Sequence, residues 1–512
     1  MSDESPQKAV WRLDVGSEAG TVELAQELST ILRSGDAVML SGDLGAGKTT
    51  FARAMIRALV DDPELEAPSP TFTLMQVYEG AGKRVVHADF YRIENTAELD
   101  GLGWEDATED AIVLVEWAER AREALSPDRL EVRLSFVDGD NREARRLTIS
   151  GYGSFVQRLA FHKALRELLQ KADWSDAKRS FLQGDASTRA YERLEKPDGR
   201  RAILMISPAR QDGPPIRYGK SYSAIARLAE NVVPFVALSQ ALRGLGLSAP
   251  EVYGRDFDAG LLIIEDLGGE SVVDEKGPIV ERYLEAAGAL AYLHAQRLPD
   301  MIAIEDGRNY HIPPYDLDAL LIEVELAVDW YLPHLKTSIS SGARAIFLNL
   351  WRQALIEVAS AAPTWTLRDY HSPNLLWLAE RKGVARIGIL DFQDCVLGHP
   401  AYDVASLGQD ARVDAPDELE LKLLAYYAKL RREADSEFDM AAFAKAYAIL
   451  AAQRATKILG IFARLDQRDR KPQYLAHLPR VESYLRKSLR HPALADVRAW
   501  YEANIPGLFR NA

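Results

Sequence analysis

Residues 42–49 read GDLGAGKT and fit the spacing G-x-x-x-x-G-K-[ST] in full. In this motif the glycines let backbone N–H groups surround a phosphate, the lysine reaches the β and γ oxygens, and the final hydroxyl is placed to ligate Mg²⁺. Residues 36–41 form a short apolar run, and residues 49–60 have apolar side chains at helical spacing, which predicts a strand, a loop and a helix. A phosphate in the loop would lie at the helix N-terminus, where the helix dipole favours an anion. We therefore expect nucleotide binding by Gly42, Gly45, Gly47, Lys48, Thr49 and Thr50.

Two further apolar runs, residues 85–87 and 111–116, are bounded by polar turns and predict additional buried strands. Glu116 ends the second run, and a carboxylate at the carboxyl end of a strand can face ligands bound at that edge of a sheet. The first part of the chain is thus predicted to be an α/β domain with a phosphate site at one edge of its sheet.

Composition limits what the whole chain can be. Its 512 residues are 47% hydrophobic and 27% charged, which is typical of two to four globular domains. The polar, acidic N-terminus and the lack of an apolar run of about 18 residues predict a cytoplasmic protein without a membrane segment. The single cysteine, Cys395, excludes intramolecular disulfides and cysteine-based zinc sites.

Charge is distributed unevenly along the chain. Residues 1–156 hold 16 Lys and Arg against 29 Asp and Glu, a net −13 out of the total −14. Phosphate contact needs clustered cations, so we expect the first part to bind no nucleic acid directly and to dock instead on a protein partner. The change in charge also indicates a domain boundary.

Three further stretches make the first part resemble the ATPase subunit of bacterial tRNA threonylcarbamoyladenosine biosynthesis (TsaE-like). They are residues 69–74 (SPTFTL), 87–92 (HADFYR) and 114–120 (LVEWAER). The resemblance implies that Asp89 and Glu116 help Thr49 to hold Mg²⁺, that Lys48 and Glu116 serve ATP hydrolysis, and that Trp117 lies beside the nucleotide. It also implies that the Ser-Pro-Thr-Phe segment senses the nucleotide, and that the module acts while docked on the partner proteins that modify adenosine 37 of tRNA.

A second motif lies in residues 366–374 (TLRDYHSPN), which contain R-D-x-x-x-x-N, and residues 389–392 (ILDF) follow it. This is the spacing of a kinase catalytic loop, in which one carboxylate lies near the attacking hydroxyl and two further side chains hold metal at the polyphosphate. Asp369 fits the first role, and Asn374 and Asp391 fit the second. Residues 375–378 and 384–390 predict a hairpin that brings Asn374 and Asp391 together.

The pattern around this motif predicts a small strand-bearing lobe followed by a helical lobe. Residues 155–171 have helical periodicity, and residues 202–206 and 260–265 are strand-like. Amphipathic helices are predicted at residues 279–296, 317–331 and 345–360. We place the domains at 1–156 and 157–512, with the lobes of the second at about 175–268 and 269–512.

This half resembles the aminoglycoside phosphotransferase-like kinases. The matching stretches are residues 184–189 (GDASTR), 262–268 (LIIEDLG) and 398–403 (GHPAYD). Within that family the opening and the Leu-Met strand are most similar to cell-wall sugar kinases that phosphorylate N-acetylmuramate and N-acetylglucosamine at the anomeric hydroxyl (AmgK-like). The resemblance implies ATP and Mg²⁺, with Gly184, Ser187 and Arg189 covering the phosphates and with Glu265 and Leu267 in the segment that pairs with adenine through its backbone.

Two residues depart from the kinase pattern. Met205 stands where the ATP-binding lysine is expected, and Leu367 replaces the first histidine of the catalytic loop. The sugar kinases also lack that lysine, and Arg189 is the nearest cation by motif position, so we still expect activity. The replacement by Leu367 should cost little, because that histidine is usually structural.

Other polar residues in this half carry weaker signals. His294 lies on an apolar helical stripe, which is typical of a core histidine, and Cys395 has no partner and suggests packing. His371 either orients Asp369 or braces the loop.

The sequence therefore predicts an α/β fusion of an ATPase serving tRNA modification with an amino-sugar kinase. Two alternatives stay open. The kinase acts on another hydroxyl acceptor, such as an aminoglycoside, choline or homoserine, or it is a silent scaffold beside a nucleotide-switched docking module.

Overall fold

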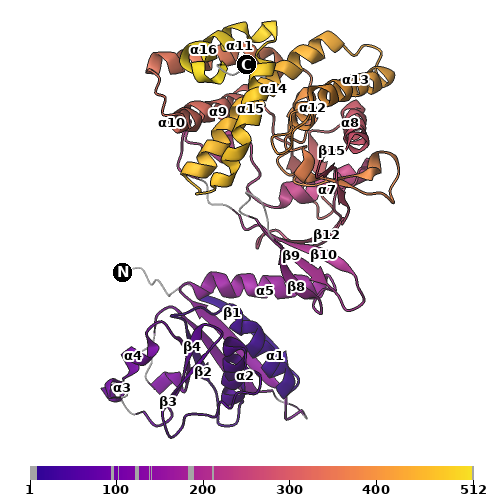
Figure 1. Cartoon of the computed structure of the whole chain (residues 1–512). Coiled ribbons are helices and arrows are strands. Elements are labelled where there is room, and N and C mark those ends of the chain that lie inside the picture. The colour runs from indigo at the N-terminus through magenta and orange to yellow at the C-terminus, as the bar shows by residue number, and fades with distance from the viewer. Residues whose placement is uncertain are drawn as a thin grey trace. The chain divides into compact units, whose positions relative to one another are not determined.

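The computed structural model describes residues 8–93, 97–101, 103–120, 126–137, 139, 141–182, 189–209 and 213–509. The chain divides into two compact units, Met1–Gln170 and Lys171–Ala512, which are indigo to violet and magenta to yellow in Figure 1. The sequence analysis places this boundary after residue 156, in the first turn of the helix α5 (Phe155–Lys171). Each unit is described by itself below.

The first unit is built on a seven-stranded mixed sheet with the order β1-β7-β6-β2-β5-β4-β3. Its centre is parallel, because β2 pairs in parallel with β5 and β6, and β4 pairs in parallel with β5. The strands expected at residues 36–41, 85–87 and 111–116 are β2, β4 and β5. The strand bounds are β1 (Lys8–Val15), β2 (Ala37–Ser41), β3 (Met75–Gly80), β4 (Lys83–Asp89), β5 (Ile112–Glu116), β6 (Arg129–Phe136) and β7 (Arg145–Tyr152).

Alternating side chains of these strands bury both faces of the sheet. Val38 and Leu40 of β2 pack with α1 (Glu18–Ser29), α2 (Lys48–Val60) and the start of α5, while Met39 packs on the opposite face with the residues around α3 (Ala97–Asp100) and α4 (Trp104–Thr108). Strands with successive apolar residues are expected wherever both faces are covered. The arrangement places the β2–α2 loop at the carboxyl edge of the sheet (Figure 1).

Helix α5 belongs to the first unit because its N-terminal half is anchored there. Phe155 and Leu159 are buried in the core formed by α1, α2 and the sheet. Both terminal nitrogens of Arg158 donate to the carboxylate of Asp36, at 2.7 and 2.8 Å. These contacts explain why the boundary between the units follows the helix and does not precede it.

The second unit begins with a five-stranded antiparallel sheet in the order β11-β12-β10-β9-β8. The strands expected at residues 202–206 and 260–265 are β10 and β12, which pair with each other. Helix α7 is packed with this sheet through β11. The bounds are β8 (Lys178–Leu182), β9 (Ala190–Glu195), β10 (Arg201–Ile206), α6 (Tyr222–Ile225), α7 (Val233–Gly244), β11 (Val252–Asp256) and β12 (Leu261–Glu265).

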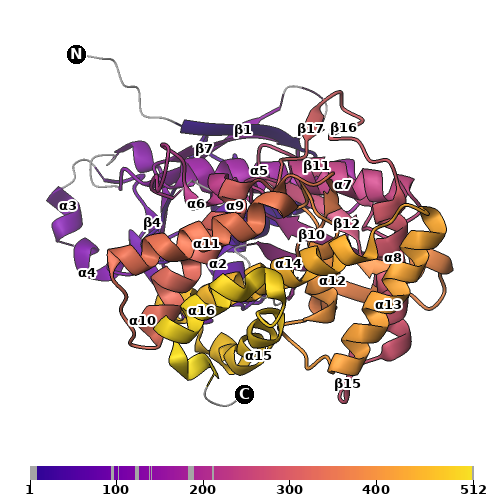
Figure 2. The same ribbon diagram turned by 90° about the horizontal axis from the view of Figure 1, so that it is seen from above.

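The rest of the second unit is mostly helical and is organised around the long helix α14, against which α9, α12 and α15 pack (Figure 2). The helix expected at residues 279–296 is α8, that at 345–360 is α11, and that at 317–331 is α9 continued by one wider turn, η3 (Ala327–Tyr331). The helix bounds are α8 (Val280–Ala295), α9 (Leu317–Leu326), α10 (Leu332–His334), α11 (Ser341–Ala359), α12 (Ala401–Gly408), α13 (Asp417–Ala434), α14 (Met440–Gln467), α15 (Leu478–Ser488) and α16 (Ala495–Asn504).

Short strands in this lobe shape the loops that carry the kinase-like motif. The hairpin expected after Asn374 is formed by β19 and β20, with Leu375 opposite Ile389. Its second strand starts later than expected, because residues 383–386 form a 3-10 turn. The strand bounds are β13 (Glu270–Ser271), β14 (Val273–Asp274), β15 (Gly277–Pro278), β16 (Met301–Ala303), β17 (Asn309–His311), β18 (Thr364–Thr366), β19 (Leu375–Trp377), β20 (Ile387–Ile389) and β21 (Val396–Gly398).

Across the described ranges of both units, every helix is too short or too polar to cross a membrane.

The close packing of α14 on α9 leads to a stability prediction. A Cβ atom added at Gly460 of α14 would lie 2.3 Å from the carbonyl carbon of Leu326, whereas one added at Gly288 of α8 would meet nothing closer than 3.6 Å. Overpacking of this kind costs about 1–3 kcal/mol or more, and an open helical glycine is improved by alanine by about 0.5–1 kcal/mol. Gly460→Ala should therefore lower the unfolding temperature of the second unit.

Calorimetry on the full chain checks this, with Gly288→Ala as the matched control that should keep or raise that temperature. Equal effects of the two substitutions would show that α14 and α9 are not packed this closely.

Candidate active sites

The loop between β2 and α2 has a backbone that requires glycine. Gly42 has φ +135°, and a Cβ atom there would lie 2.1 Å from the carbonyl oxygen of Leu134. Gly47 has φ +104° and starts α2 without a side-chain cap. The first N–H groups of the helix are thus left for a ligand, and an anion is favoured at that position.

Lys48 is buried against this loop. Its Nζ donates to the carbonyl oxygens of Gly42 and Asp43, at 2.7 and 3.0 Å, and lies 3.8 Å from the centre of the Trp117 ring. Burial lowers the pKa of Lys48, although nearby carboxylates, Glu116 first among them, favour the charged form. The structure therefore brings Trp117 next to the P-loop lysine, and Trp117 has a left-handed backbone with φ 57°.

Glu116 links the P-loop helix to the neighbouring strand. Its Oε2 accepts a hydrogen bond from the Thr49 hydroxyl at 3.0 Å, and its Oε1 lies 3.0 Å from Nε2 of His87. Both Glu116 and His87 are buried, and Nδ1 of His87 has no partner among the described residues. Nε2 of His87 therefore carries the proton that the carboxylate accepts.

Asp89 ends β4 and lies opposite Glu116, which ends β5. Its Oδ2 accepts hydrogen bonds from the hydroxyls of Ser69 and Thr71, at 2.8 and 3.0 Å, and its Oδ1 accepts one from the backbone N–H of Tyr91. The structure thus connects the Ser-Pro-Thr-Phe segment directly to Asp89. Phe72 of that segment is 89% exposed.

A polar cavity of about 500 Å³ lies beside the P-loop, lined by Ser41, Gly42, Asp43 and Trp117 together with side chains of β6 and β7. Thr50 lies elsewhere, because its side chain lines a hollow between α1 and α2. The other residues expected in this site, Gly42 to Thr49 with Asp89, Glu116 and Trp117, gather at one edge of the sheet.

In the second unit, two buried aspartates hold the loop that contains Asp369. The carboxylate of Asp403 accepts the backbone N–H groups of Leu367 and Arg368, at 2.6 and 2.8 Å, and that of Asp410 accepts the N–H of Ser372 at 2.8 Å. A carboxylate that accepts backbone N–H groups makes strong, charge-assisted hydrogen bonds. The loop therefore has a fixed backbone on both sides of Asp369.

Beneath the loop, Arg368 is almost fully buried and forms an ion pair with Glu323 of α9. Glu323 also accepts from Nζ of Lys457 at 2.9 Å and from Gln453 at 3.0 Å, and it bonds to the hydroxyl of Tyr315. Burial alone would raise the pKa of Glu323, but Lys457 and Arg368 hold it below its ordinary value. Glu323 therefore connects the loop to α14 as an ionised group.

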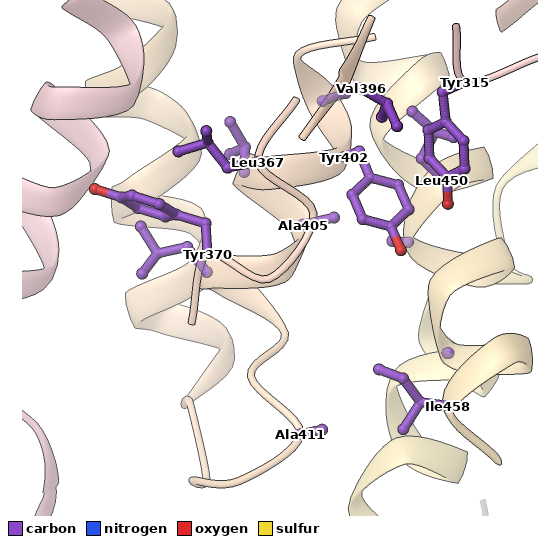
Figure 3. Packing of buried hydrophobic residues seen from close by; sticks show 14 of the residues in the cluster. Tyr315, Leu367, Tyr370, Val396, Tyr402, Ala405, Ala411, Leu450 and Ile458 are labelled. Carbon is purple, nitrogen blue, oxygen red and sulfur yellow. The ribbon is translucent and has the colours of Figure 1, made fainter. Parts of the chain in front are cut away.

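Apolar packing surrounds this network. Figure 3 shows Leu367 and Tyr370 of the loop on one side of α12, with Tyr402 and Ala405 on the helix itself, and Leu450 and Ile458 of α14 on the other side. Tyr402 contacts Tyr315 edge to face. Helix α12 thus lies between the loop and α14.

Asp369 is half-buried and faces positive charge. Burial by itself raises its pKa, but Lys457, His371 and Arg454 hold that pKa below the ordinary value. Its backbone carbonyl accepts a hydrogen bond from the side chain of Asn374 at 2.9 Å. Asp369 is therefore ionised at neutral pH and fixed relative to Asn374.

Asp391 lies at the end of the hairpin, close to Asn374. The N–H of Leu390 donates to the carbonyl of Asn374 at 2.9 Å, so the hairpin brings the two side chains together as expected. Oδ1 of Asp391 accepts from Gln393 at 2.6 Å and from Nη1 of Arg189 at 2.9 Å. Burial and the charge of Asp369 raise the pKa of Asp391, and Arg189 opposes that shift.

Asn374 and Asp391 line a cleft of about 400 Å³ between the small sheet and the hairpin. Its wall includes Glu265, Leu267 and Ile203. The Glu265 side chain is turned to Arg243 and Arg381, and its N–H donates to the carbonyl of Glu251, so only other backbone groups of this segment can serve a ligand.

Packing explains why β10 has a methionine, Met205, at the position where a lysine is expected. Ile203 lines the cleft, whereas Met205 is 2% exposed and belongs to the main core of this unit. Arg189, immediately before β9, instead forms an ion pair with Asp391. Gly184 and Ser187 lie outside the described residues.

Two of the remaining residues singled out from the sequence, His294 and Cys395, are structural. His294 is buried, with Nδ1 2.9 Å from the Tyr427 hydroxyl, and Cys395 is buried in the core. His371 is close enough to Asp369 for its charge to affect the pKa of that carboxylate.

Sequence reasoning missed five residues that build this site. Asp403 lies in the stretch GHPAYD, which by itself assigns it no role, and Asp410, Glu323, Arg454 and Lys457 lie outside the motifs. Arg454 and Lys457 could have been found, because with Gln453 they are the long polar side chains within the mostly apolar stretch 446–463. Asp410 and Glu323 have no such signal.

The two sites define a protein with a P-loop nucleotide-binding domain and a kinase-type phosphotransferase domain. The profile described as threonylcarbamoyl adenosine biosynthesis protein TsaE matches residues 15–146, and that described as phosphotransferase enzyme family matches residues 178–443. The chain therefore belongs to both families, with a TsaE domain in its first unit and an ATP-dependent kinase of the phosphotransferase enzyme family in its second.

Known relatives match the two parts separately. An N-acetylmuramate/N-acetylglucosamine kinase of Caulobacter vibrioides is 37% identical over 346 residues, which are 65% of this chain and 93% of that protein. A kinase of the same name from Pseudomonas putida is 31% identical over 65% of this chain and 91% of its own. The tRNA threonylcarbamoyladenosine biosynthesis protein TsaE of Rickettsia felis is 35% identical over 28% of this chain and 84% of its own. The α/β fold and the fusion expected from the sequence are thus confirmed.

The ion network of Glu323 generates the second prediction. Removing one partner of a buried ion pair leaves an unpaired charge and costs about 3–5 kcal/mol. Glu323→Gln leaves Arg368 and Lys457 without their carboxylate, so it should lower the unfolding temperature of the second unit strongly.

Glu325→Gln, two residues along the same helix, is the matched control for calorimetry on the full chain. Glu325 is also buried, but its partners Arg217 and Arg344 have side chains 30% and 35% exposed, so water can replace the lost bonds. A Glu323 variant no less stable than the Glu325 variant would contradict the central role of this network.

Proposed function

We propose that the second unit phosphorylates N-acetylmuramate and N-acetylglucosamine at the anomeric hydroxyl, and that the first unit is an ATPase that supports threonylcarbamoyl modification of tRNA. The observation that carries the kinase proposal is the ionised Asp369 fixed beside Asn374 and Asp391 in a cleft. The similarity to named N-acetylmuramate/N-acetylglucosamine kinases over 65% of the chain supports the choice of acceptor.

Asp369 accepts a hydrogen bond from the attacking hydroxyl and orients it towards the γ-phosphate. A carboxylate held ionised by Lys457 and Arg454 suits this role better than that of a strong base, since its pKa is lowered. The rigid loop fixes its position, because Asp403 and Asp410 bind the backbone on either side. Fixed geometry is the main contribution that a protein makes to phosphoryl transfer.

Asn374 and Asp391 are the residues that would hold Mg²⁺ in the second unit. Both offer oxygen atoms in the same cleft, which is the ligand type that this cation prefers. When bound, Mg²⁺ neutralises charge on the phosphate oxygens. Arg189 supplies the second positive charge in place of the missing lysine, and the backbone around Glu265 and Leu267 faces the adenine.

In the first unit, Lys48 and the P-loop backbone bind the β- and γ-phosphates, and Trp117 lies beside Lys48. Thr49 and Glu116, whose oxygens lie 3.0 Å apart, would hold Mg²⁺ together with Asp89. The hydrogen bonds from Ser69 and Thr71 to Asp89 give the segment of the exposed Phe72 a direct route to a residue that would hold Mg²⁺. This route fits a domain that acts with protein partners of the tRNA-modification system.

Asp369→Asn tests the kinase. Loss of a group that positions and accepts the proton lowers rates by about 10²–10⁴-fold, while the fold should persist because the Asp369 side chain makes none of the loop-holding bonds. Purified full-length protein is incubated with ATP, Mg²⁺ and N-acetylmuramate, N-acetylglucosamine, galactose or kanamycin, and phosphorus NMR identifies the product.

An anomeric phosphate on the two N-acetylated sugars supports the proposal. A product from kanamycin alone would assign a different acceptor, and no acceptor-dependent product would make the second unit a scaffold.

Lys48→Ala tests whether the two activities are separate. It removes the phosphate-binding ammonium of the first unit, so ATP hydrolysis that does not depend on sugar should be lost, measured with the tRNA-modifying partners present. Sugar phosphorylation should be unchanged in the same preparation. Loss of both activities would contradict the independence of the two sites.

A further inference from the structure

Arg454 of α14 is a buried guanidinium without a carboxylate. It is 5% exposed, and its Nη2 donates to the hydroxyl of Ser406 at 2.7 Å. Its Nε is buried without a partner, and within the described ranges of the chain no carboxylate lies within 4 Å of it. Of its five N–H groups, those ranges therefore use one. A buried charge without a partner costs folding free energy, and a bound anion would offset that cost.

The neighbouring cations are different. Arg368 and Lys457 share the carboxylate of Glu323, and Lys457 also donates to the Tyr402 hydroxyl at 3.2 Å. Arg454 and Lys457 of α14 both lie 5.8 Å from the centre of the Tyr402 ring. Of these three cations, Arg454 is thus the one that has no carboxylate partner among the described residues.

Arg454 also belongs to the cluster of charges around the Asp369 loop, because it lies beside the Tyr402 ring that Lys457 also contacts, and Lys457 shares Glu323 with Arg368 of that loop. Burial raises the pKa of Asp369, and the charge of Arg454 is one of several neighbouring charges that lower it. Any anionic acceptor that approaches Asp369 and Asp391 meets two carboxylates, so it needs a cation beside them. N-acetylmuramate is such an acceptor, since it differs from N-acetylglucosamine by a lactyl ether that ends in a carboxylate.

We propose that Arg454 binds the lactyl carboxylate of N-acetylmuramate and makes the acceptor site selective for this sugar acid over N-acetylglucosamine. This inference rests on the proposed kinase function. The planar guanidinium presents paired N–H groups that match a carboxylate in a bidentate arrangement. The same positive charge repels polycationic acceptors such as aminoglycosides, which gives the site a second element of selectivity.

The test is a cycle of two changes, one in the enzyme and one in the substrate. Full-length wild-type protein and Arg454→Gln are assayed with N-acetylmuramate, its neutral methyl ester and N-acetylglucosamine. The wild type should prefer the acid over the ester by about tenfold to a hundredfold in kcat/KM, the value of a charged hydrogen bond. Arg454→Gln should lose that preference, mainly through KM, so that kcat/KM falls at least about tenfold more for the acid than for the ester or for N-acetylglucosamine.

Arg464→Gln is the matched control, because Arg464 lies on the same helix, is partly buried and contacts Tyr222. It should leave the preference for the acid intact. Arg454→Lys, which keeps a charge but not the planar pair of donors, should retain part of it.

Other outcomes overturn the inference in distinguishable ways. If Arg454→Gln lowers activity equally with all three acceptors, Arg454 binds the transferred phosphate or supports Asp369, and only this inference fails. If the wild type phosphorylates neither sugar, the proposed function fails and takes the inference with it. If the variant does not fold, the wild-type comparison of acid with ester decides, and equal rates overturn the inference.

Discussion

The second unit depends on one buried carboxylate, Glu323. It lies on α9, accepts from Arg368 of the catalytic loop and accepts from Lys457 of α14. An ion pair in a protein core is stable only when each charge is fully matched by hydrogen bonds. The geometry of Asp369 therefore follows from a network in which no single member can be removed alone.

The same network sets the electrostatics of the reaction. Lys457 is bonded to Glu323 and also acts on Asp369, whose pKa it lowers. Asp391 has the opposite shift, because burial and the charge of Asp369 raise its pKa. The surroundings thus shift the pKa values of these two neighbouring carboxylates in opposite directions. In the proposed reaction Asp369 stays an anion beside the acceptor, and a cation at the phosphates would stabilise the ionised form of Asp391.

Local patterns in the sequence predicted the parts of the site that local geometry determines. The P-loop follows from glycine spacing, and the proximity of Asn374 and Asp391 follows from a hairpin formed by two apolar runs that are close in sequence. The roles of Glu323, Asp403 and Asp410 could not be predicted from the sequence. Each residue binds a loop that lies more than 30 residues away along the chain, and none of the three belongs to a motif that assigns it this role. The end of the first unit was displaced for the same reason: the bonds of Arg158 to Asp36 connect residues 122 positions apart.

The two units bind phosphates by contrasting means. In the first, positive φ angles at glycines turn backbone N–H groups towards the anion, and the lysine follows the motif directly. In the second, the proposed site uses side chains on separate elements: Arg189 just before β9, and Asn374 and Asp391 on either side of the β19–β20 hairpin. A site assembled from side chains can lose one cation and use another, which is why Met205 can join the core while Arg189 faces Asp391. A site made of backbone has no such freedom, since any Cβ at Gly42 would collide with the carbonyl of Leu134. This difference explains why the first site could be recognised from eight consecutive residues, whereas the acceptor side of the second becomes visible only in three dimensions.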